Sequence, residues 1–446
     1  MKNYLTIERK NTSIQKFFRS FYFNFIQENF NIMIFSSKKD KMQNINDAQL
    51  FPQLHNSIGT IPTILFLINT AIGTGIMKLG TAFKAGCILT IILNTIVVII
   101  STYSFYLYLK VASITKSSTF ESVWAKLFGE KTVVICGTIS IISKFMAIRT
   151  YSGFCIDQLQ LLIVTYYEDA PWWFVDRYVL LALITIIFYI PPLFSKSLTM
   201  VTIISSIKVV FLALLCILII YRFFEHLSID GFDPRNEIVY FRFDRNLLLC
   251  LDIFLNAYPV MPISFPGLKH FRHLTVNRFL SNYIITMIIC WIVYNLIGLL
   301  CYFTFFELNT GDLILSYYPN DALNGISQFS LAIMIIFTIP VTLNHIRFVF
   351  IDLISKGAEY NSSVWIQSGF IILLLAYVIS CIQGKISFWI STITSIRSPL
   401  VLFILPSIFY IRAFKNTNKT HFALSIIILI LGIASMFFVL YIPFYE

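Results

Sequence analysis

Polar side chains and glycines interrupt the first long apolar stretch of the chain, which reads LINTAIGTGIMKLG over residues 67–80. A helix that breaks at Gly73, Thr74 and Gly75 frees backbone N–H and carbonyl groups. At membrane depth such groups persist only when they line a cavity or bind a ligand. Freed N–H groups at the start of the next half-helix suit a carboxylate, whereas freed carbonyls together with Asn69 suit a small cation. The same pattern also fits close packing of helices, which small residues allow.

A second apolar stretch is interrupted in a similar way. LDIFLNAYPVMPISFPG, residues 251–267, contains prolines at 259, 262 and 266. Proline removes a backbone donor and clashes with the preceding turn, so a regular helix cannot run from Asn256 to Pro262. A simple proline kink is the alternative interpretation. We predict a substrate site where the two breaks meet, formed by Asn69, Gly73, Thr74, Gly75, Asn256 and Tyr258.

Charged side chains inside apolar stretches are further candidates, because charge at membrane depth is costly and marks functional positions. Arg149 and Asp157 lie in the stretch 132–165, and Asp252 lies one turn before Asn256. We treat all three as candidate gating residues, and Asp252 also as a candidate proton acceptor. A structural carboxylate is the alternative for Asp252.

The elements that must position these residues are membrane-spanning helices. Of the 446 residues, 57% are hydrophobic and 12% are charged, whereas soluble proteins carry about 25% charged residues. A bilayer is crossed by about 20 apolar residues. Eleven stretches meet this criterion: 58–77, 86–109, 132–165, 178–194, 198–224, 246–266, 279–306, 326–344, 363–382, 388–411 and 421–442. We therefore expect an all-α polytopic membrane protein.

The interrupted stretches are the first and the sixth, five spans apart, as in an inverted repeat of two five-helix halves. The predicted organisation is a tail over residues 1–56, a transmembrane domain over 57–442 and a short C-terminus over 443–446. Lys and Arg concentrate on the side of the tail, which the positive-inside rule places in the cytosol. The C-terminus is then outside the cytosol. Lys and Arg in cytosolic segments account for the positive net charge, so nucleic-acid binding is not needed to explain it.

Several other classes are disfavoured. The eight cysteines lie in or beside apolar runs without paired metal spacing, so we expect packing residues, no disulfide framework and no metal site. The N-terminus does not have the pattern of a cleavable signal peptide. The six histidines lie in loops or at the edges of spans, which argues against an intramembrane enzyme.

Four motifs resemble the amino acid/auxin permease family, most closely its neutral amino acid transporters of the system A and system N type. The family's first span carries N-x-x-x-G-S-G-I-L-G-L, which corresponds here to the stretch from Asn69 to Gly75 and onward. TIPVTLNHIR at 338–347 is similar to its T-V-P and P-I-R elements. FILPSIFY at 403–410 matches its tenth-span signature, and MPISFPGLK at 261–269 resembles the end of its sixth span. The likeness covers roughly residues 57–442.

This resemblance implies a LeuT-like core of ten helices plus one that moves amino acids by alternating access. It also implies a cation site shared by Asn69 and Thr338. The chain departs from the family pattern in several places. Lys78 and Gly80 stand where Gly and Pro are usual, Ala257 or Tyr258 replaces a common His, and the acidic residue before the L-K pair is absent.

Lys208 bears on the coupling ion. It is the one charge in the stretch IISSIKVVFLALL of the fifth span, and in LeuT-like folds this span passes beside the cation site. Our hypothesis is that Lys208 occupies or competes for the Asn69–Thr338 site, so that coupling is to protons or absent. The alternative is a lysine that snorkels toward the cytosol and leaves a sodium site intact.

The expected function is secondary active transport of amino acids, coupled to H+ or Na+. An amino-acid sensor that binds without carrying its substrate is the alternative. We expect no cofactor and no obligate protein partner beyond the lipid bilayer. The plasma membrane and a vacuolar or lysosome-like membrane both fit the sequence.

Overall fold

The computed structural model describes residues 59–72, 74–117, 119–167, 169–194, 198–229, 238–258, 275–306, 322–355, 362–382, 396–415 and 419–441. All structural statements below concern these residues. The predicted tail and C-terminus therefore lie outside the described part, as do Gly73 and the three prolines of the sixth span. The side chains of Thr74 and Met77 also fall outside it.

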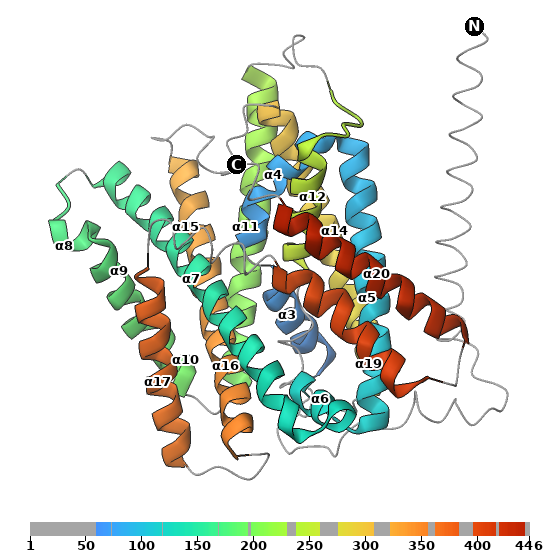
Figure 1. Ribbon diagram of the computed structural model, residues 1–446. Coiled ribbons are helices and arrows are strands. Elements are labelled where there is room, and N and C mark those ends of the chain that lie inside the picture. Colours follow the sequence, from blue (N-terminus) through green and yellow to red (C-terminus); the bar gives the residue numbers. More distant parts are fainter. Residues whose placement is uncertain are drawn as a thin grey trace, which may run out of the picture. The chain divides into compact units, whose positions relative to one another are not determined.

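Every regular element in the described residues is helical (Figure 1). The first half contains α3 (Thr60–Ala71), η1 (Thr74–Lys78), α4 (Leu79–Ala82), η2 (Phe83–Ala85), α5 (Cys87–Thr115), α6 (Phe120–Phe128), η3 (Glu130–Thr132), α7 (Val133–Tyr166), α8 (Trp172–Val175), α9 (Arg177–Ile184), η4 (Thr185–Tyr189), α10 (Ile190–Phe194) and α11 (Leu198–Ile229). The second half contains α12 (Arg245–Ala257), α14 (Val276–Phe305), α15 (Ala322–Ile336), α16 (Thr338–Ser355), α17 (Ser362–Ser380), η7 (Leu400–Ile404), α19 (Leu405–Ala413) and α20 (Lys419–Tyr441).

Nine helices in the described residues are long and apolar enough to cross a membrane, and they match nine of the eleven predicted spans. The other two are the first and the sixth, and both are broken. The first span consists of the twelve-residue α3, an extended Ile72 and the short turns η1 and α4. The sixth contains α12, which ends at Ala257. The predicted break of the first span is confirmed, and α12 ends within the predicted sixth span, as a break there requires.

Short polar side chains set the starts of several helices. Asp176 accepts hydrogen bonds from the first backbone N–H groups of α9, and Asp244 does the same for α12. Thr119 and Ser122 form a reciprocal capping box at the start of α6. These caps satisfy backbone donors that a helix leaves without intrahelical partners. They therefore define where each helix begins after its connecting loop.

The loop before α12 packs on the start of α5. Gly86 has a φ of 110°, and a Cβ built there would lie 2.5 Å from the carbonyl oxygen of Tyr240. The N–H of Cys87 donates to Val239, and the N–H of Arg242 donates to Ala85. Only glycine permits this backbone approach. The contact ties the end of the first broken span to the segment that leads into the second.

The broken first span is enclosed by helices from both halves of the chain. In Figure 1, α3 lies among α11, α14 and α16, and each of these packs against it. The helix α7 packs along α15, α16 and α17. All eight cysteines are free in the structure, and six of them are buried.

Arg347 joins three helices in the core. Its side chain is completely buried, and its guanidinium donates to the carbonyl oxygens of Leu193 at the end of α10 and of Trp365 in α17. The guanidinium carbon lies 4.0 Å from the centre of the Trp365 ring. Gly369 leaves the space that this arrangement needs, because a Cβ there would meet the guanidinium at 1.9 Å. A planar, multidentate cation is the residue type best suited to such a junction.

Candidate functional site

The ends of the two broken helices meet. Gly75 packs against Ala257, since a Cβ built on Gly75 would lie 3.6 Å from the Cα of Ala257. The hydroxyl of Tyr294 in α14 lies 3.3 Å from the carbonyl oxygen of Ala71 and 3.0 Å from that of Ala257. These carbonyls belong to the last residues of α3 and α12. One buried hydroxyl therefore serves as donor to the freed ends of both helices.

Asn256 lies at the end of α12 with both ends of its amide engaged. Its nitrogen donates to the backbone oxygen of Asp252 at 3.0 Å and to the side-chain oxygen of Asp252 at 2.8 Å. Its oxygen accepts a 2.7 Å hydrogen bond from Ser398. Asp252 and Asn256 thus support each other on consecutive turns of one helix. This contact favours the structural interpretation of Asp252 over a gate.

Tyr258 follows α12 and is completely buried. Its hydroxyl donates to the side-chain oxygen of Asn94 in α5 at 2.7 Å. Its ring lies against Tyr294, with ring centres 5.2 Å apart. The structure therefore brings Gly75, Asn256 and Tyr258 to the junction of the broken helices, as the predicted substrate site requires.

The ammonium of Lys208 lies at the end of α3. Lys208 extends from α11 and is only 1% exposed. Its Nζ donates to the backbone oxygen of Asn69 at 2.7 Å, to that of Ile72, and to the hydroxyl of Thr338 at 2.7 Å. The side chain thus points into the protein core. It does not snorkel to a surface.

The other predicted cation ligand is also buried at this point. Asn69 is fully buried, and its amide nitrogen donates to Ser205 in α11 at 2.8 Å. Its amide oxygen has no hydrogen-bond partner among the described residues. Among the described side chains of the predicted site, this oxygen is the one buried polar atom without a hydrogen-bond donor. It can therefore accept a hydrogen bond from a ligand.

The chemistry of this oxygen set can be compared with a sodium site. Two backbone carbonyls at an unwound helix end and one hydroxyl are the ligand types that bind Na+ in transporters with broken helices. Here all three oxygens accept from the Lys208 ammonium. A sodium ion placed among them would lie against a fixed positive charge. The residues as arranged therefore do not fit sodium.

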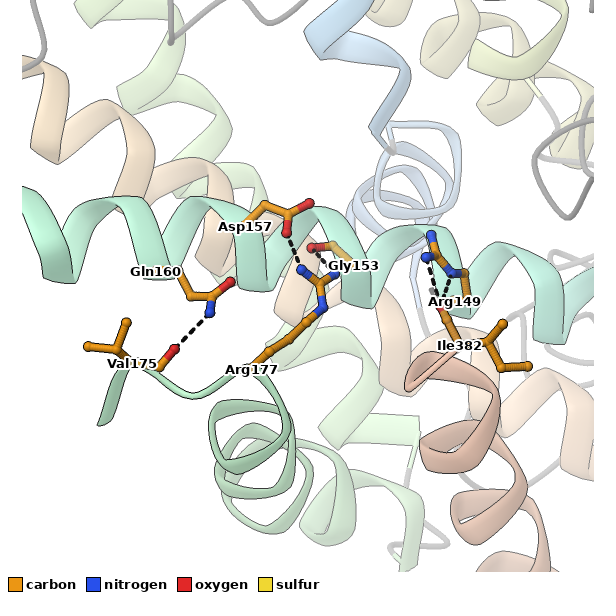
Figure 2. Close-up of polar contacts among 7 residues, drawn as sticks. All are labelled: Arg149, Gly153, Asp157, Gln160, Val175, Arg177 and Ile382. Carbon is orange, nitrogen blue, oxygen red and sulfur yellow. Dashed lines mark hydrogen bonds and ion pairs between the residues drawn. The ribbon is translucent and has the colours of Figure 1, made fainter. Parts of the chain in front are cut away.

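The candidate gating residues Arg149 and Asp157 make contacts away from the broken helices (Figure 2). Arg149 donates twice to the backbone oxygen of Ile382, at 3.0 and 2.8 Å, just beyond α17. Asp157 pairs with Arg177 at the start of α9, and Arg177 also donates to the carbonyl of Gly153 at 3.3 Å. These contacts tie α7 to α9 and α17. They favour a role in holding α7, and gating by either residue stays a prediction.

Sequence reasoning missed several residues of the junction. Tyr294, Ser205, Ser398 and Asn94 supply the hydrogen bonds described above, yet each is only one of several polar residues in a mostly apolar span. A polar residue at membrane depth is the only signal that the sequence offers for them. Their partners lie far away along the chain. The described residues contain no cluster of metal-ligating side chains.

Solved structures with the same fold include two complexes with small molecules. The crystal structure of MhsT in complex with L-phenylalanine has a TM-score of 0.58 and 11% identity, over 86% of this chain and 98% of that one. The substrate-bound outward-open state of a Na+-coupled sialic acid symporter has a TM-score of 0.57 and 13% identity, over 94% and 95% of the two chains. These matches show a LeuT-like fold.

The family follows from the sequence comparison. The family model described as transmembrane amino acid transporter protein matches residues 56–444, and the chain belongs to this family. It is similar to the putative sodium-coupled neutral amino acid transporter 8 of Xenopus tropicalis, with 24% identity over 64% of this chain and 68% of the relative. It is also similar to the sodium-coupled neutral amino acid symporter 2 of Danio rerio, with 22% identity over 80% of this chain and 76% of the relative.

The protein is thus a secondary active transporter that moves amino acids across a membrane. The resemblance to the amino acid permeases is confirmed. The family is one of transporters, so the protein is not an enzyme. The comparisons lend no support to the sensor alternative.

Proposed function

We propose that this transporter carries amino acids through a site at the junction of α3 and α12, and that the Lys208 ammonium takes the place of a coupling sodium ion. Transport then needs no sodium, and a proton carried by Lys208 is the coupling ion. The proposed substrate residues are Asn69, Asn256 and Tyr258 together with the backbone of residues 73–75.

The observation that carries this proposal is the set of three hydrogen bonds from Lys208. They join α11 to the last turn of α3 and to the first residue of α16. A lysine differs from a sodium ion because it stays on the protein and loses its charge only by releasing a proton. Loss of that charge removes the electrostatic contact that joins these three helices. Protonation of one residue is thereby coupled to the packing of the broken helix.

The two relatives bear on the substrate and on the coupling ion. Both are named as sodium-coupled, and both are named for neutral amino acids. We propose neutral amino acids as substrates here too, since the described junction offers an amide oxygen and backbone groups, and its one carboxylate, that of Asp252, already accepts from Asn256. We propose that coupling differs, because the ammonium already holds the oxygens that sodium would need.

The bias of Lys and Arg toward one set of loops supports a cytosolic N-terminus. The protein would reside in the plasma membrane or in a vacuolar or lysosome-like membrane. An acidic compartment on the far side of the membrane would provide the proton gradient that the proposed coupling uses. Epitope tags at the two termini, with selective permeabilisation of cells, would test the orientation directly.

The decisive experiment is uptake of radiolabelled neutral amino acids into proteoliposomes, with sodium and proton gradients imposed separately. We expect uptake driven by the proton gradient and unchanged when choline replaces sodium. Lys208→Ala should abolish the response to the proton gradient. Lys131→Ala, which removes an exposed lysine at the start of α7, is the matched control and should behave as the wild type.

Two results would contradict the proposal. Uptake driven by sodium in the wild type would assign the site to the ion and leave Lys208 a structural role. Unchanged sodium and pH dependence in Lys208→Ala would remove the lysine from the coupling mechanism.

A further inference from the structure

A cavity of about 140 Å³ lies between α6, α7 and the helix formed by η7 and α19. It is separate in sequence from every residue of the proposed substrate and cation sites. Most of its lining is apolar, including Phe120, Trp124, Ile139 and Leu400. Two cationic side chains, Lys144 and Arg397, also line it. A cavity of this size holds a group about as large as a benzene ring.

Lys144 is buried in this lining without a partner. It is 1% exposed, and its Nζ has no hydrogen bond and no ion pair with any described residue. It lies about 16 Å along α7 from the first residue of that helix. Lys208 is buried to the same extent, yet it makes three hydrogen bonds. A buried ammonium without a partner is among the most costly groups in a protein, so a ligand is the expected complement.

Arg397 adds a second incompletely paired cation. It is 7% exposed, and its Nε has no partner among the described residues. His345 in α16 is electrostatically coupled to both cations, and neither of its ring nitrogens makes a hydrogen bond within the described part of the chain. Lys144 and Arg397 therefore bring donors from two different helices to the lining of one cavity.

The nearby acids do not pair with these cations. Glu121 lines the cavity and is 3% exposed, and Asp352 in α16 is its acidic neighbour. Glu121 is electrostatically attracted to Lys144, but no ion pair joins Glu121 to Lys144 or Arg397 among the described residues. The two acids instead oppose each other's ionisation, since each carboxylate raises the cost of charging the other. Acidic groups therefore lie near the cavity, but none of them hydrogen-bonds to the Lys144 ammonium among the described residues.

The walls specify what kind of anion would fit. Aromatic and aliphatic side chains offer no hydrogen bonds to a hydrated inorganic ion, but they suit the body of an amphiphile. Ile139 lines the cavity and is 49% exposed, and Ile135 and Ile142 on the same stripe of α7 are 58% and 46% exposed. Such a stripe on a membrane-spanning helix faces lipid. The cavity is therefore bordered by a lipid-facing side chain.

We propose that this cavity binds the carboxylate of a long-chain fatty acid from the bilayer, held by Lys144 and Arg397, with the acyl chain leaving past Ile139. The bound carboxylate accepts hydrogen bonds from the Lys144 Nζ and the Arg397 Nε, which have no acceptor among the described residues. Binding also links α7 to the helix that carries Arg397. The site would make the stability of the transporter depend on the free fatty acid of its membrane.

The test uses the fluorescence of Trp124, which lines the cavity. The full chain in nanodiscs is titrated with dibromostearate, whose bromines quench nearby tryptophans, and with its methyl ester, which lacks the carboxylate. We expect saturable quenching by the acid, absent with the ester and absent in Trp124→Phe. Lys144→Met should weaken binding about tenfold or more, the usual loss for a hydrogen bond to a charged group. Lys131→Met is the control and should bind as the wild type.

Thermal unfolding gives a second readout that does not depend on fluorescence. Oleate should raise the Tm of the wild type and of Lys131→Met. Lys144→Met should unfold no lower than the wild type without oleate, because it removes an unpaired buried charge, and should gain nothing from oleate. A structural lysine would show the opposite, a Lys144→Met variant of much lower Tm.

Three outcomes would overturn the proposal. One is equal quenching by acid and ester, and another is unchanged binding in Lys144→Met. The third is displacement of dibromostearate by glutamate but not by oleate, which would assign the cations to an acidic transported substrate.

Discussion

The Nζ of Lys208 lies 2.7 Å from the hydroxyl of Thr338 and donates a hydrogen bond to it. The two residues belong to α11 and α16, and between them lies the end of the broken α3. The same ammonium bonds to two carbonyl oxygens of that end. The Lys208 ammonium is thus the hydrogen-bond donor to the backbone oxygens at the broken end of α3.

Thr338→Val tests this contact with a side chain of nearly the same shape. The Thr338 hydroxyl also donates to the carbonyl of Met334 at 2.9 Å, so it is fixed as an acceptor for Lys208. Loss of a hydrogen bond to a charged group should lower the free energy of unfolding by about 1.5–3 kcal/mol. We expect reduced uptake as well. The control is Thr342→Val, one turn later, whose hydroxyl donates only to the carbonyl of Thr338; equal losses in both variants would argue against a special role for Thr338.

Tyr294→Phe tests the bridge between the two broken helices. The substitution leaves the carbonyls of Ala71 and Ala257 without their shared donor, at a cost of about 1 kcal/mol or more. We expect uptake to fall while the protein still folds. Tyr283→Phe on the same helix removes a buried hydroxyl that has no partner among the described residues. It should leave stability unchanged or raised, and a wild-type uptake rate in Tyr294→Phe would contradict the proposed bridge.

Gly369→Ala tests the junction formed by Arg347. Alanine normally favours a helix over glycine, so an ordinary site would gain stability. Here the added Cβ would lie 1.9 Å from the guanidinium and force it from its partners. We expect a loss of about 1–3 kcal/mol, as is usual for overpacking a core. Thermal unfolding in detergent would measure it. Gly59→Ala, at the N-cap of α3, is the control for steric overlap, since nothing lies within 4 Å of its added Cβ and a small loss from the weaker cap is expected.

Glu121→Gln tests the pH dependence of stability. Burial raises the pKa of Glu121 from 4.5 to about 7, with the neighbouring Asp352 adding to the rise and Ser140 and Lys144 opposing it. The folded chain therefore keeps a proton that the unfolded chain releases as the pH rises from 4.5 to about 7. The stabilisation is present below this range and is lost across it, by about 3 kcal/mol in total.

Glu121→Gln should flatten this dependence and should be more stable than the wild type above about pH 7. Glu130→Gln, which changes an exposed carboxylate nearby, should keep the wild-type slope. Unfolding temperatures of the wild type and both variants, measured from pH 4.5 to about 7, would test this expectation. An unchanged slope in Glu121→Gln would show that the proton is held elsewhere.

The class of the protein follows from the sequence alone, because its signals are local. Apolar stretches of span length, the Gly73–Gly75 turn and the prolines after Tyr258 are read within one segment at a time. An apolar segment of span length forms a membrane helix, and glycine or proline interrupts that helix, whichever segments pack against it. The eleven spans, the two broken helices and the family could therefore be predicted without coordinates.

Partners of buried charges could not be predicted, because they come from segments far apart in the chain. Lys208 bonds to residues 130 to 139 positions away, and Arg149 reaches Ile382 at a separation of 233. The sequence places Lys144 and Lys208 in similar apolar stretches. Only helix packing decides that Lys208 meets three oxygens while Lys144 meets none in the described residues. Burial makes that difference costly, and so the tertiary structure decides which lysine is satisfied and which one calls for a ligand.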